Sequence, residues 1–356
     1  MNLGPQVPPP EDQPVAPAPS HRAVWGRLVF LALTLIALYV LGPSLLKVFS
    51  AWPKLLRIAP EWFVVMFGVE IASFICIWGL QRIALRTSSW FGVATAQLAG
   101  NAVSRVVPGG AAAGGAVQFG MLVQDGVEAA QVGAGLTVAS LISTATLLTL
   151  PLLSVPAVLL GRPVPSGLAQ AAWLGGVVFV VAFGLGWMLL VNDHAILAVG
   201  RTIEWITNHT VRRHGTPKSG TPERLLSERN KVSEDLQEQW WKALLFALGN
   251  WLFDYLALLA ALTAVGSHPR PTLVLLAYVA SMILGMIPIT PGGLGFVEAG
   301  LTALLALAGV HAADAVTATL AYRLVSYWLP LPTGGVAALL HARRARRAAQ
   351  GQPSTA

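Results

Sequence analysis

Long apolar runs dominate the chain. Six of them contain at most one charged residue each and reach roughly the 20 residues that a helix needs to cross a bilayer. They cover residues 28–46, 62–80, 132–161, 167–191, 244–266 and 315–340. Pro151 and Pro156 should kink or tilt the third run, and Pro330 and Pro332 the last. This pattern predicts an all-α polytopic membrane protein with about six crossings.

Two further apolar runs, residues 90–123 and 272–310, are interrupted by helix-breaking residues. The interruptions are Pro108-Gly109-Gly110 and Gly114-Gly115 in the first run, and Pro288, Pro291-Gly292-Gly293 and Gly295 in the second. Broken backbone at membrane depth persists only where protein or a water-filled cavity satisfies it. Each run is therefore predicted to form two half-helices around a Gly-rich tip, as a re-entrant hairpin, which brings the total to eight or so hydrophobic segments.

The two interruptions indicate a weak internal repeat. Pro108 and Pro291 are 183 residues apart, and Gly126-Val127 and Gly309-Val310 keep the same offset. Three predicted crossings, an odd number, separate the two hairpins. If each hairpin returns to its own side, the two enter from opposite faces, which is the inverted-topology repeat of many transporters.

Composition agrees with a membrane environment. The chain is 55% hydrophobic and 11% charged, with a mean hydropathy of +0.64, whereas soluble domains carry roughly a quarter charged residues. The net charge of +7 lies between and after apolar runs, the membrane pattern rather than that of a nucleic-acid partner. The single cysteine, Cys76, excludes a disulfide within the chain and a Cys-rich zinc site.

No motif for a cofactor or metal accompanies these runs, and none is expected. Histidines at segment ends or in loops lack metal-ligand spacing and are expected to be solvated. These are His194, His209, His214, His268, His311 and His341.

The short polar segments predict domains and orientation. Residues 1–22 form a Pro-rich, disordered tail, 23–342 the transmembrane domain and 343–356 a basic tail. The first apolar run is expected to be a retained helix rather than a cleaved signal peptide. Lys and Arg of the short segments place both termini in the cytoplasm of a cell inner or plasma membrane. Residues 193–240, a cytoplasmic polar insert, are expected to form short amphipathic or solvated helices.

Polar residues inside apolar runs are the best functional candidates, because each is costly in lipid. Asn101 and Arg105 are four residues apart and share a helix face, as do Asn250 and Asp254. Both pairs are expected to point inward. A structural polar clamp and a substrate role are equally open for them.

Three more charged residues lie in apolar runs. Glu298 follows the second break, where it would cap backbone N–H groups, carry a proton or bind a cationic headgroup. Arg323 lies mid-span and needs a partner, for which Glu298 and Asp254 are candidates. Arg105 and Arg323 have the side chain that binds phosphate bidentately. Glu70 would pair with an arginine or be protonated.

The second break carries a family resemblance. The segment Pro291-Gly292-Gly293-Leu294-Gly295-Phe296-Val297-Glu298, with Ala321-Tyr322-Arg323-Leu324 downstream, resembles the late motif of the bacterial lysylphosphatidylglycerol synthase transmembrane, or flippase-like, family. The similarity covers roughly residues 25–340. It implies a membrane region associated with moving lipids between leaflets, here without the soluble aminoacyl-transferase domain of larger members. Charges that the family often places after the early Pro-Gly element are missing, and Gln118 offers a hydrogen-bonding group there.

The leading hypothesis is a non-enzymatic lipid flippase or translocase. It would move or bind a phospholipid or lipid-linked precursor, with Arg105 and Arg323 on the phosphate and Asp254 and Glu298 balancing charge. The alternatives are a proton- or cation-coupled small-solute transporter and a non-transporting membrane partner of an envelope-biosynthesis enzyme. An intramembrane enzyme would need a nucleophile, paired acids or a metal site, and no firm match to these is present.

Overall fold

The computed structural model describes residues 53, 55–107, 110–154, 221–286 and 291–350, and the single positions 166, 170, 177, 181 and 184. All regular elements in these residues are helical. The predicted span 28–46, the tail 1–22, nearly all of the span 167–191 and the first part of the polar insert lie outside the described residues.

Three helices among the described residues are long and apolar enough to cross a membrane. They are α2 (Pro60–Ala84), α5 (Ala129–Thr149), which continues into the 3-10 turn η1 (Leu150–Ser154), and the part Glu238–Ala264 of α9 (Thr221–Ala264). The predicted run 62–80, the described part of the run 132–161 and all but the last two residues of the run 244–266 fall on these helices. The α-helix gives way to the 3-10 turn beside Pro151, as expected. One prediction was wrong in form: residues 221–240 are not short separate helices but the first half of α9, a single helix of 44 residues.

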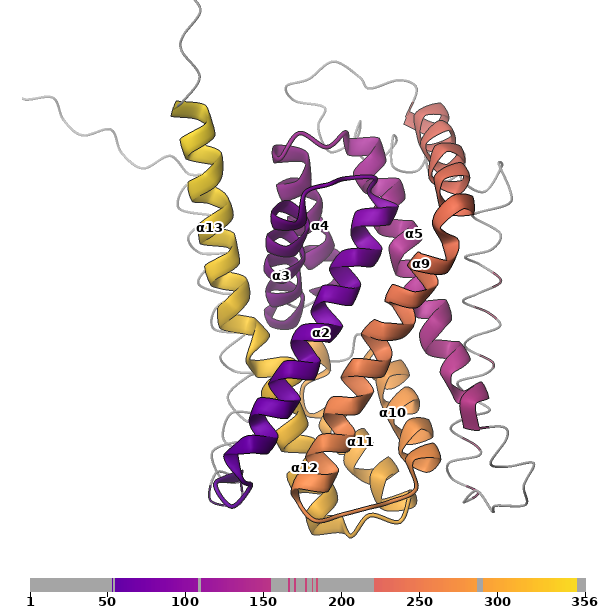
Figure 1. Cartoon of the computed structure of the whole chain (residues 1–356), viewed down its shortest axis with the longest axis vertical. Coiled ribbons are helices and arrows are strands. Elements are labelled where there is room, and N and C mark those ends of the chain that lie inside the picture. Colours follow the sequence, from indigo (N-terminus) through magenta and orange to yellow (C-terminus); the bar gives the residue numbers. More distant parts are fainter. Residues whose placement is uncertain are drawn as a thin grey trace, which may run out of the picture.

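The two Pro-Gly breaks each separate a pair of short helices. The first pair is α3 (Trp90–Val106) and α4 (Gly110–Gln124), and the second is α10 (Pro271–Met286) and α11 (Phe296–Leu307), with the turn η2 (Pro291–Gly293) before α11. The interruption predicted at Gly114-Gly115 was wrong, because α4 runs through both glycines. In each pair the helices pack against one another as a hairpin. The hairpins start from opposite ends of the molecule, and their tips point toward its middle (Figure 1).

Close approach of α3 and α4 depends on glycine. A Cβ at Gly100 would lie 2.7 Å from the carbonyl oxygen of Gly114, and a Cβ at Gly114 would meet the backbone of Gly100. Gly110 opens α4 beside the backbone of Ser104, which also leaves no room for a side chain. The small residues in the first predicted hairpin are therefore needed for its two backbones to touch.

The last predicted span, 315–340, is a chain of three elements. α12 (Ala312–Arg323) passes through a π-helical turn η3 (Leu324–Trp328) into α13 (Pro330–Gln350). Pro330 has no N–H to offer the carbonyl of Ser326, so the regular ladder breaks there and the helix changes course. Together the three elements extend from one end of the molecule to the other (Figure 1).

The internal repeat is visible in the helix ends. α4 and α11 both end with a left-handed glycine, Gly126 (φ 90°) and Gly309 (φ 92°). In both turns the next residue donates back to the previous turn, Val127 to Leu122 (3.2 Å) and Val310 to Leu305 (3.0 Å). This is the Schellman arrangement, repeated at the 183-residue offset. The order α2–α3–α4–α5 therefore matches α9–α10–α11–α12, and the two units run in opposite directions (Figure 1).

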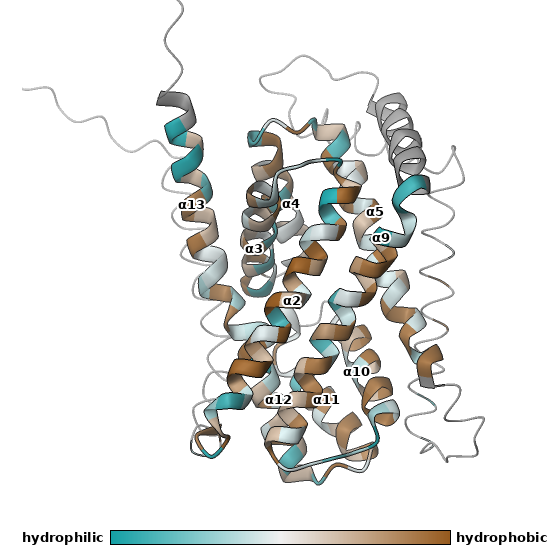
Figure 2. Ribbon diagram, in the orientation of Figure 1, coloured by the Kyte–Doolittle hydropathy of each residue, from teal (hydrophilic) through white to brown (hydrophobic). Residues whose placement is uncertain are grey.

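The largest buried cluster lies where α9, α10, α11 and α12 meet, around Tyr278, Tyr322, Leu258 and Leu301. Outward faces are also apolar: Val64 on α2 is 71% exposed and Leu245 on α9 is 60% exposed. Figure 2 shows apolar residues along most of α2, α10, α11 and the coloured part of α9, with hydrophilic residues gathered in the upper coloured part of α13. A surface of this kind is stable when lipid covers it.

Candidate functional site

Arg105 binds the π-helical turn. It lies near the C-terminus of α3, where its Nε donates to Asn101 Oδ1 at 2.9 Å. Its Nη1 donates to the carbonyls of Ser326 (2.8 Å) and Tyr327, and its guanidinium lies 4.8 Å from the centre of the Tyr327 ring. The Ser326 carbonyl accepts this bond because Pro330 cannot supply the helical one. The predicted Asn101–Arg105 face thus joins the tip of the first hairpin to η3.

Arg323 and Glu298 form a buried ion pair at the tip of the second hairpin. Arg323 Nε lies 2.8 Å from Glu298 Oε1, and Arg323 is 8% exposed. The other carboxylate oxygen accepts from the Gly295 N–H at 2.6 Å, which caps α11. Both expected contacts of Glu298, the cap and the arginine, are therefore present together. Arg323 also stacks on the Tyr327 ring at 4.2 Å, so Tyr327 contacts both arginines.

The tip of the second hairpin needs glycine for its backbone. Gly292, Gly293 and Gly295 have φ of 59°, 70° and 77°, in the left-handed region that costs residues with a Cβ about 1–2 kcal/mol. A Cβ at Gly292 would also press on the Tyr327 ring. The predicted helix break is present at Pro291, where η2 begins, whereas Pro108 and Gly109 of the first break and Pro288 of the second lie outside the described residues.

Asp254 is held by two tyrosines. The hydroxyls of Tyr278 and Tyr322 both donate to its carboxylate, Tyr322 at 2.9 Å to each oxygen. Both tyrosines are almost fully buried. Asp254 is therefore in the interior, as predicted, but its direct partners are neutral hydroxyls rather than Arg323.

Asn250, one turn before Asp254, has a different role. Its Nδ2 donates to the Ser73 hydroxyl at 2.8 Å, and that hydroxyl donates to the Asn250 carbonyl at 2.9 Å. The exchange ties α9 to α2 where these two long helices pack. For Asn250 the structural clamp that the sequence left open is present.

Glu70 joins the site, although the sequence did not place it among the binding residues. It is 6% exposed, the carboxyl of Asp254 is among its electrostatic neighbours, and its Oε2 atom has no hydrogen-bond partner. The sequence did offer one sign of its importance, because Glu70 is the single charged residue in the apolar run 62–80. The tyrosines carry a second missed signal, because four of the five in the chain, at 255, 278, 322 and 327, lie in or beside this site.

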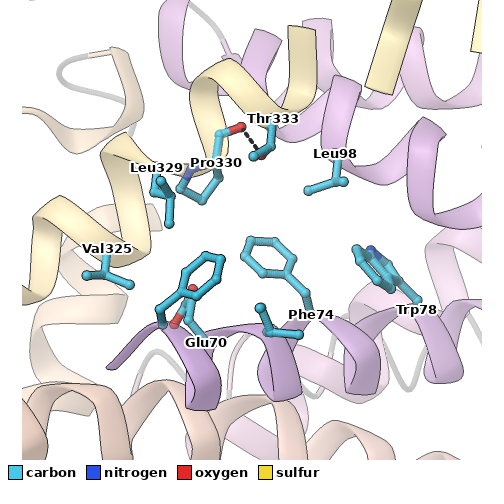
Figure 3. Close-up of a pocket in the computed structure, with 10 residues that line it drawn as sticks. Glu70, Phe74, Trp78, Leu98, Val325, Leu329, Pro330 and Thr333 are labelled. Atoms are coloured by element: carbon cyan, nitrogen blue, oxygen red, sulfur yellow. Dashed lines mark hydrogen bonds between the residues drawn. The ribbon is translucent and has the colours of Figure 1, made fainter. Parts of the chain in front are cut away.

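A groove of about 140 Å³ opens beside Glu70. Figure 3 shows Glu70, Phe74 and Trp78 of α2 facing Leu98 of α3 and the segment of η3 and α13 that includes Leu329 and Thr333. Thr333 is turned inward to donate to the Pro330 carbonyl at 3.0 Å. Glu70 is the one charged residue among the described residues that line the groove. Apolar side chains at its rim face outward: Phe67 is 45% exposed and Leu329 is 38% exposed.

One histidine contradicts the expectation of solvation. His341 on α13 is 3% exposed, and its Nδ1 lies 3.0 Å from the Thr95 hydroxyl on α3. Its Nε2 lies 3.5 Å from Asp125 at the end of α4. It was missed because burial here comes from α13 crossing the first hairpin at Gly334, where a Cβ would meet α3. Gln118, a candidate substitute in this half, donates to Gln81 at 2.8 Å.

No group of three or more metal-ligating side chains occurs in the part of the chain that the structure describes. The described helices define a class of protein: an all-α, multi-pass membrane protein in which two oppositely directed hairpins meet at a buried cluster of charged residues. Residues 24–334 match the family model described as the lysylphosphatidylglycerol synthase TM region. The chain belongs to this family.

Individual relatives are more distant. A UPF0104 membrane protein of Methanothermobacter thermautotrophicus is 26% identical over 156 residues, which are 42% of this chain and 44% of the relative. The UPF0104 membrane protein PH1989 of Pyrococcus horikoshii is 34% identical over 96 residues, 27% of this chain and 29% of the relative. The chain thus spans less than half the length of these relatives. No solved structure matches it.

Proposed function

We propose that this protein is a lipid translocase that binds an anionic phospholipid or lipid-linked precursor at the meeting point of its two hairpins. The observation that carries the proposal is the apolar groove between α2, α3 and α13. It opens on the outward apolar surface and has a buried carboxyl group, Glu70, in its wall. An acyl chain matches such a lining, and a small polar solute does not.

The hairpins supply the second line of support. At 1.5 Å per residue, α3 and α4 are about 25 and 22 Å long and α11 about 18 Å, all shorter than a hydrocarbon core of about 30 Å. We take both hairpins to be re-entrant, with tips near the middle of the membrane. Broken backbone there is favoured only beside a cavity or other protein. A headgroup that crosses the membrane would therefore meet both tips halfway.

The arginines supply the phosphate chemistry. Arg105 donates through Nε and Nη1, and Arg323 through Nε and Nη2. In the proposed complex a headgroup phosphate binds the other terminal nitrogen of each, Nη2 of Arg105 and Nη1 of Arg323. Tyr327 contacts both guanidinium groups, so the two arginines lie close enough together to bind one phosphate.

Photo-crosslinking tests whether the groove selects such lipids. A benzoylphenylalanine replaces Leu329, at the rim of the groove, or Leu339, which is 63% exposed on α13 outside it. Each variant is placed in nanodiscs that mix anionic and zwitterionic phospholipids, and mass spectrometry identifies the adducts.

We expect the anionic share of adducts at Leu329 to exceed that at Leu339, which reports the bulk mixture. Adding Arg105→Gln should remove the excess while the protein stays monodisperse. Equal shares at the two positions in the unaltered background would contradict the proposal.

A second candidate is proton- or cation-coupled secondary transport. The observation that favours it is that the buried carboxyl group of Glu70 on α2 has a second carboxyl group, Asp254 of α9, as an electrostatic neighbour, since acidic pairs in membrane interiors serve as proton or cation sites. If this candidate is right, Glu70→Gln should abolish the uptake of a small solute that an imposed proton gradient drives. Any downhill movement of lipid should stay intact in the same variant. Loss of both activities together would favour the lipid pathway.

A further inference from the structure

A basic cleft lies at the end of α2, away from the charged cluster. Its volume is about 500 Å³, and it lies between the end of α2, the turn that follows and the middle of α9. The polar residues that line it are Arg82, Arg86, Thr87, Ser88, Gln239 and Lys242. Three cations, two hydroxyls and an amide thus surround it, and no carboxylate is among its described lining residues. This set of donors suits a phosphate-bearing anion.

The backbone at Arg86 is the second observation. Four helices, α2, α4, α9 and α11, end in the same left-handed turn, and in three of them the left-handed residue is Gly126, Gly266 or Gly309. In α2 it is Arg86, at φ 48°, the one described residue other than glycine with positive φ. Thr87 makes the same bond as its counterparts, N–H to the Arg82 carbonyl at 3.2 Å. Glycine can form this turn without strain, as the other three helices show. In α2 an arginine has the unfavourable left-handed conformation instead, and backbone strain of this kind accompanies functional sites.

Tryptophans place the cleft at the level of lipid headgroups. Trp240 and Trp241 precede Lys242 on α9 and are 59% and 50% exposed, and Trp90, which begins α3, is 43% exposed. Exposed tryptophans gather where hydrocarbon meets water. Two of them also contact the cations of the cleft: Arg82 lies 4.2 Å from the centre of the Trp90 ring, and Lys242 lies 5.5 Å from that of Trp241. In addition, Arg82 Nε is buried without a hydrogen-bond partner.

We propose that this cleft is a separate binding site for a phosphate-bearing anion, and that the anion is the headgroup of an anionic phospholipid at the membrane surface. Arg86, Arg82 and Lys242 bind the phosphate, while the hydroxyls of Thr87 and Ser88 complete its hydrogen bonds. Arg82 is twelve residues beyond Glu70 on α2, about 18 Å along the helix. The site therefore holds lipid at one surface and does not depend on lipid movement through the charged cluster.

The test measures thermal unfolding of the full-length chain in detergent, with added phosphatidylglycerol, phosphatidylcholine or inorganic phosphate. In the wild type, phosphatidylglycerol raises the Tm and phosphatidylcholine does not. Arg86→Gly is the decisive variant, because it removes the guanidinium and also the backbone strain. We expect that about tenfold more phosphatidylglycerol is needed for the same rise in Tm above the variant's own lipid-free value.

Arg82→Gln and Lys242→Gln should weaken the response in the same way. Arg346→Gln, which removes one exposed positive charge on α13, should keep it and serves as the matched control. A lower lipid-free Tm in Arg86→Gly with an unchanged lipid response would make Arg86 structural and overturn the site. If inorganic phosphate gives the same rise, lost in the same variants, the phosphate site stands and the lipid source is overturned.

Discussion

The Arg323–Glu298 pair permits a quantitative prediction. Glu298→Ala removes the acceptor of the Gly295 N–H, and loss of a helix cap costs about 1 kcal/mol. It also leaves Arg323, which is 8% exposed, without its counterion. Breaking a buried pair from one side costs about 3–5 kcal/mol. We therefore expect Glu298→Ala to lower the free energy of unfolding by about 4–6 kcal/mol.

Two further variants separate the cap from the charge. Glu298→Gln keeps an oxygen for the Gly295 N–H and loses only the ion pair, so it should cost about 1 kcal/mol less than Glu298→Ala. Combining Glu298→Gln with Arg323→Met removes both charges, and the double variant should be more stable than either single variant, because no unpaired charge remains.

The assay is equilibrium unfolding in mixed detergent micelles, followed by tryptophan fluorescence. A double-mutant cycle gives the coupling energy between the two positions. Additive costs of under about 1 kcal/mol each would refute the reasoning, since they would mean that the pair is effectively solvated.

The other predictions concern close packing and the tyrosine bonds. Gly114→Ala should destabilise the first hairpin by about 1–3 kcal/mol, because the added Cβ meets the backbone of α3. Gly115→Ala, with open space around its Cβ, should be neutral or stabilising by up to about 1 kcal/mol; equal effects in thermal unfolding would contradict this packing. Tyr322→Phe should cost about 1.5–3 kcal/mol, since its hydroxyl serves a carboxylate. Tyr255→Phe, whose hydroxyl donates to a backbone carbonyl, should cost only about 1 kcal/mol in the same unfolding assay, and the reverse order would be incompatible with the structure.

Much of the fold could be predicted because local chemistry dictates it. Adjacent proline and glycine residues coincide with both breaks, so the pairs α3–α4 and α10–α11 could be predicted from them. Gly114-Gly115 has no such effect, because tertiary packing keeps both glycines inside α4. The repeat was likewise visible, because the left-handed turns at Gly126 and Gly309 favour glycine. Glu298 was expected to cap the next helix for the same local reason.

The partners of the charged residues could not be predicted, because they come from distant parts of the chain. Arg105 binds carbonyls more than 220 positions away. The sequence shows, through Pro330, that the Ser326 carbonyl has no α-helical N–H donor. It does not show which side chain donates to that carbonyl instead. Glu70 and Asp254 meet only because α2 packs on α9. Periodicity within either helix contains no information about that contact.

The measurement that tests the central claim most directly is lipid translocation in liposomes. Purified protein is reconstituted with a fluorescent anionic phospholipid, and dithionite is added outside. The account predicts bleaching well beyond the outer-leaflet half, and loss of that excess in Arg105→Gln but not in Arg346→Gln. Bleaching that stops at the half with the wild-type protein, or an excess that Arg105→Gln leaves unchanged, would contradict lipid passage between the hairpins.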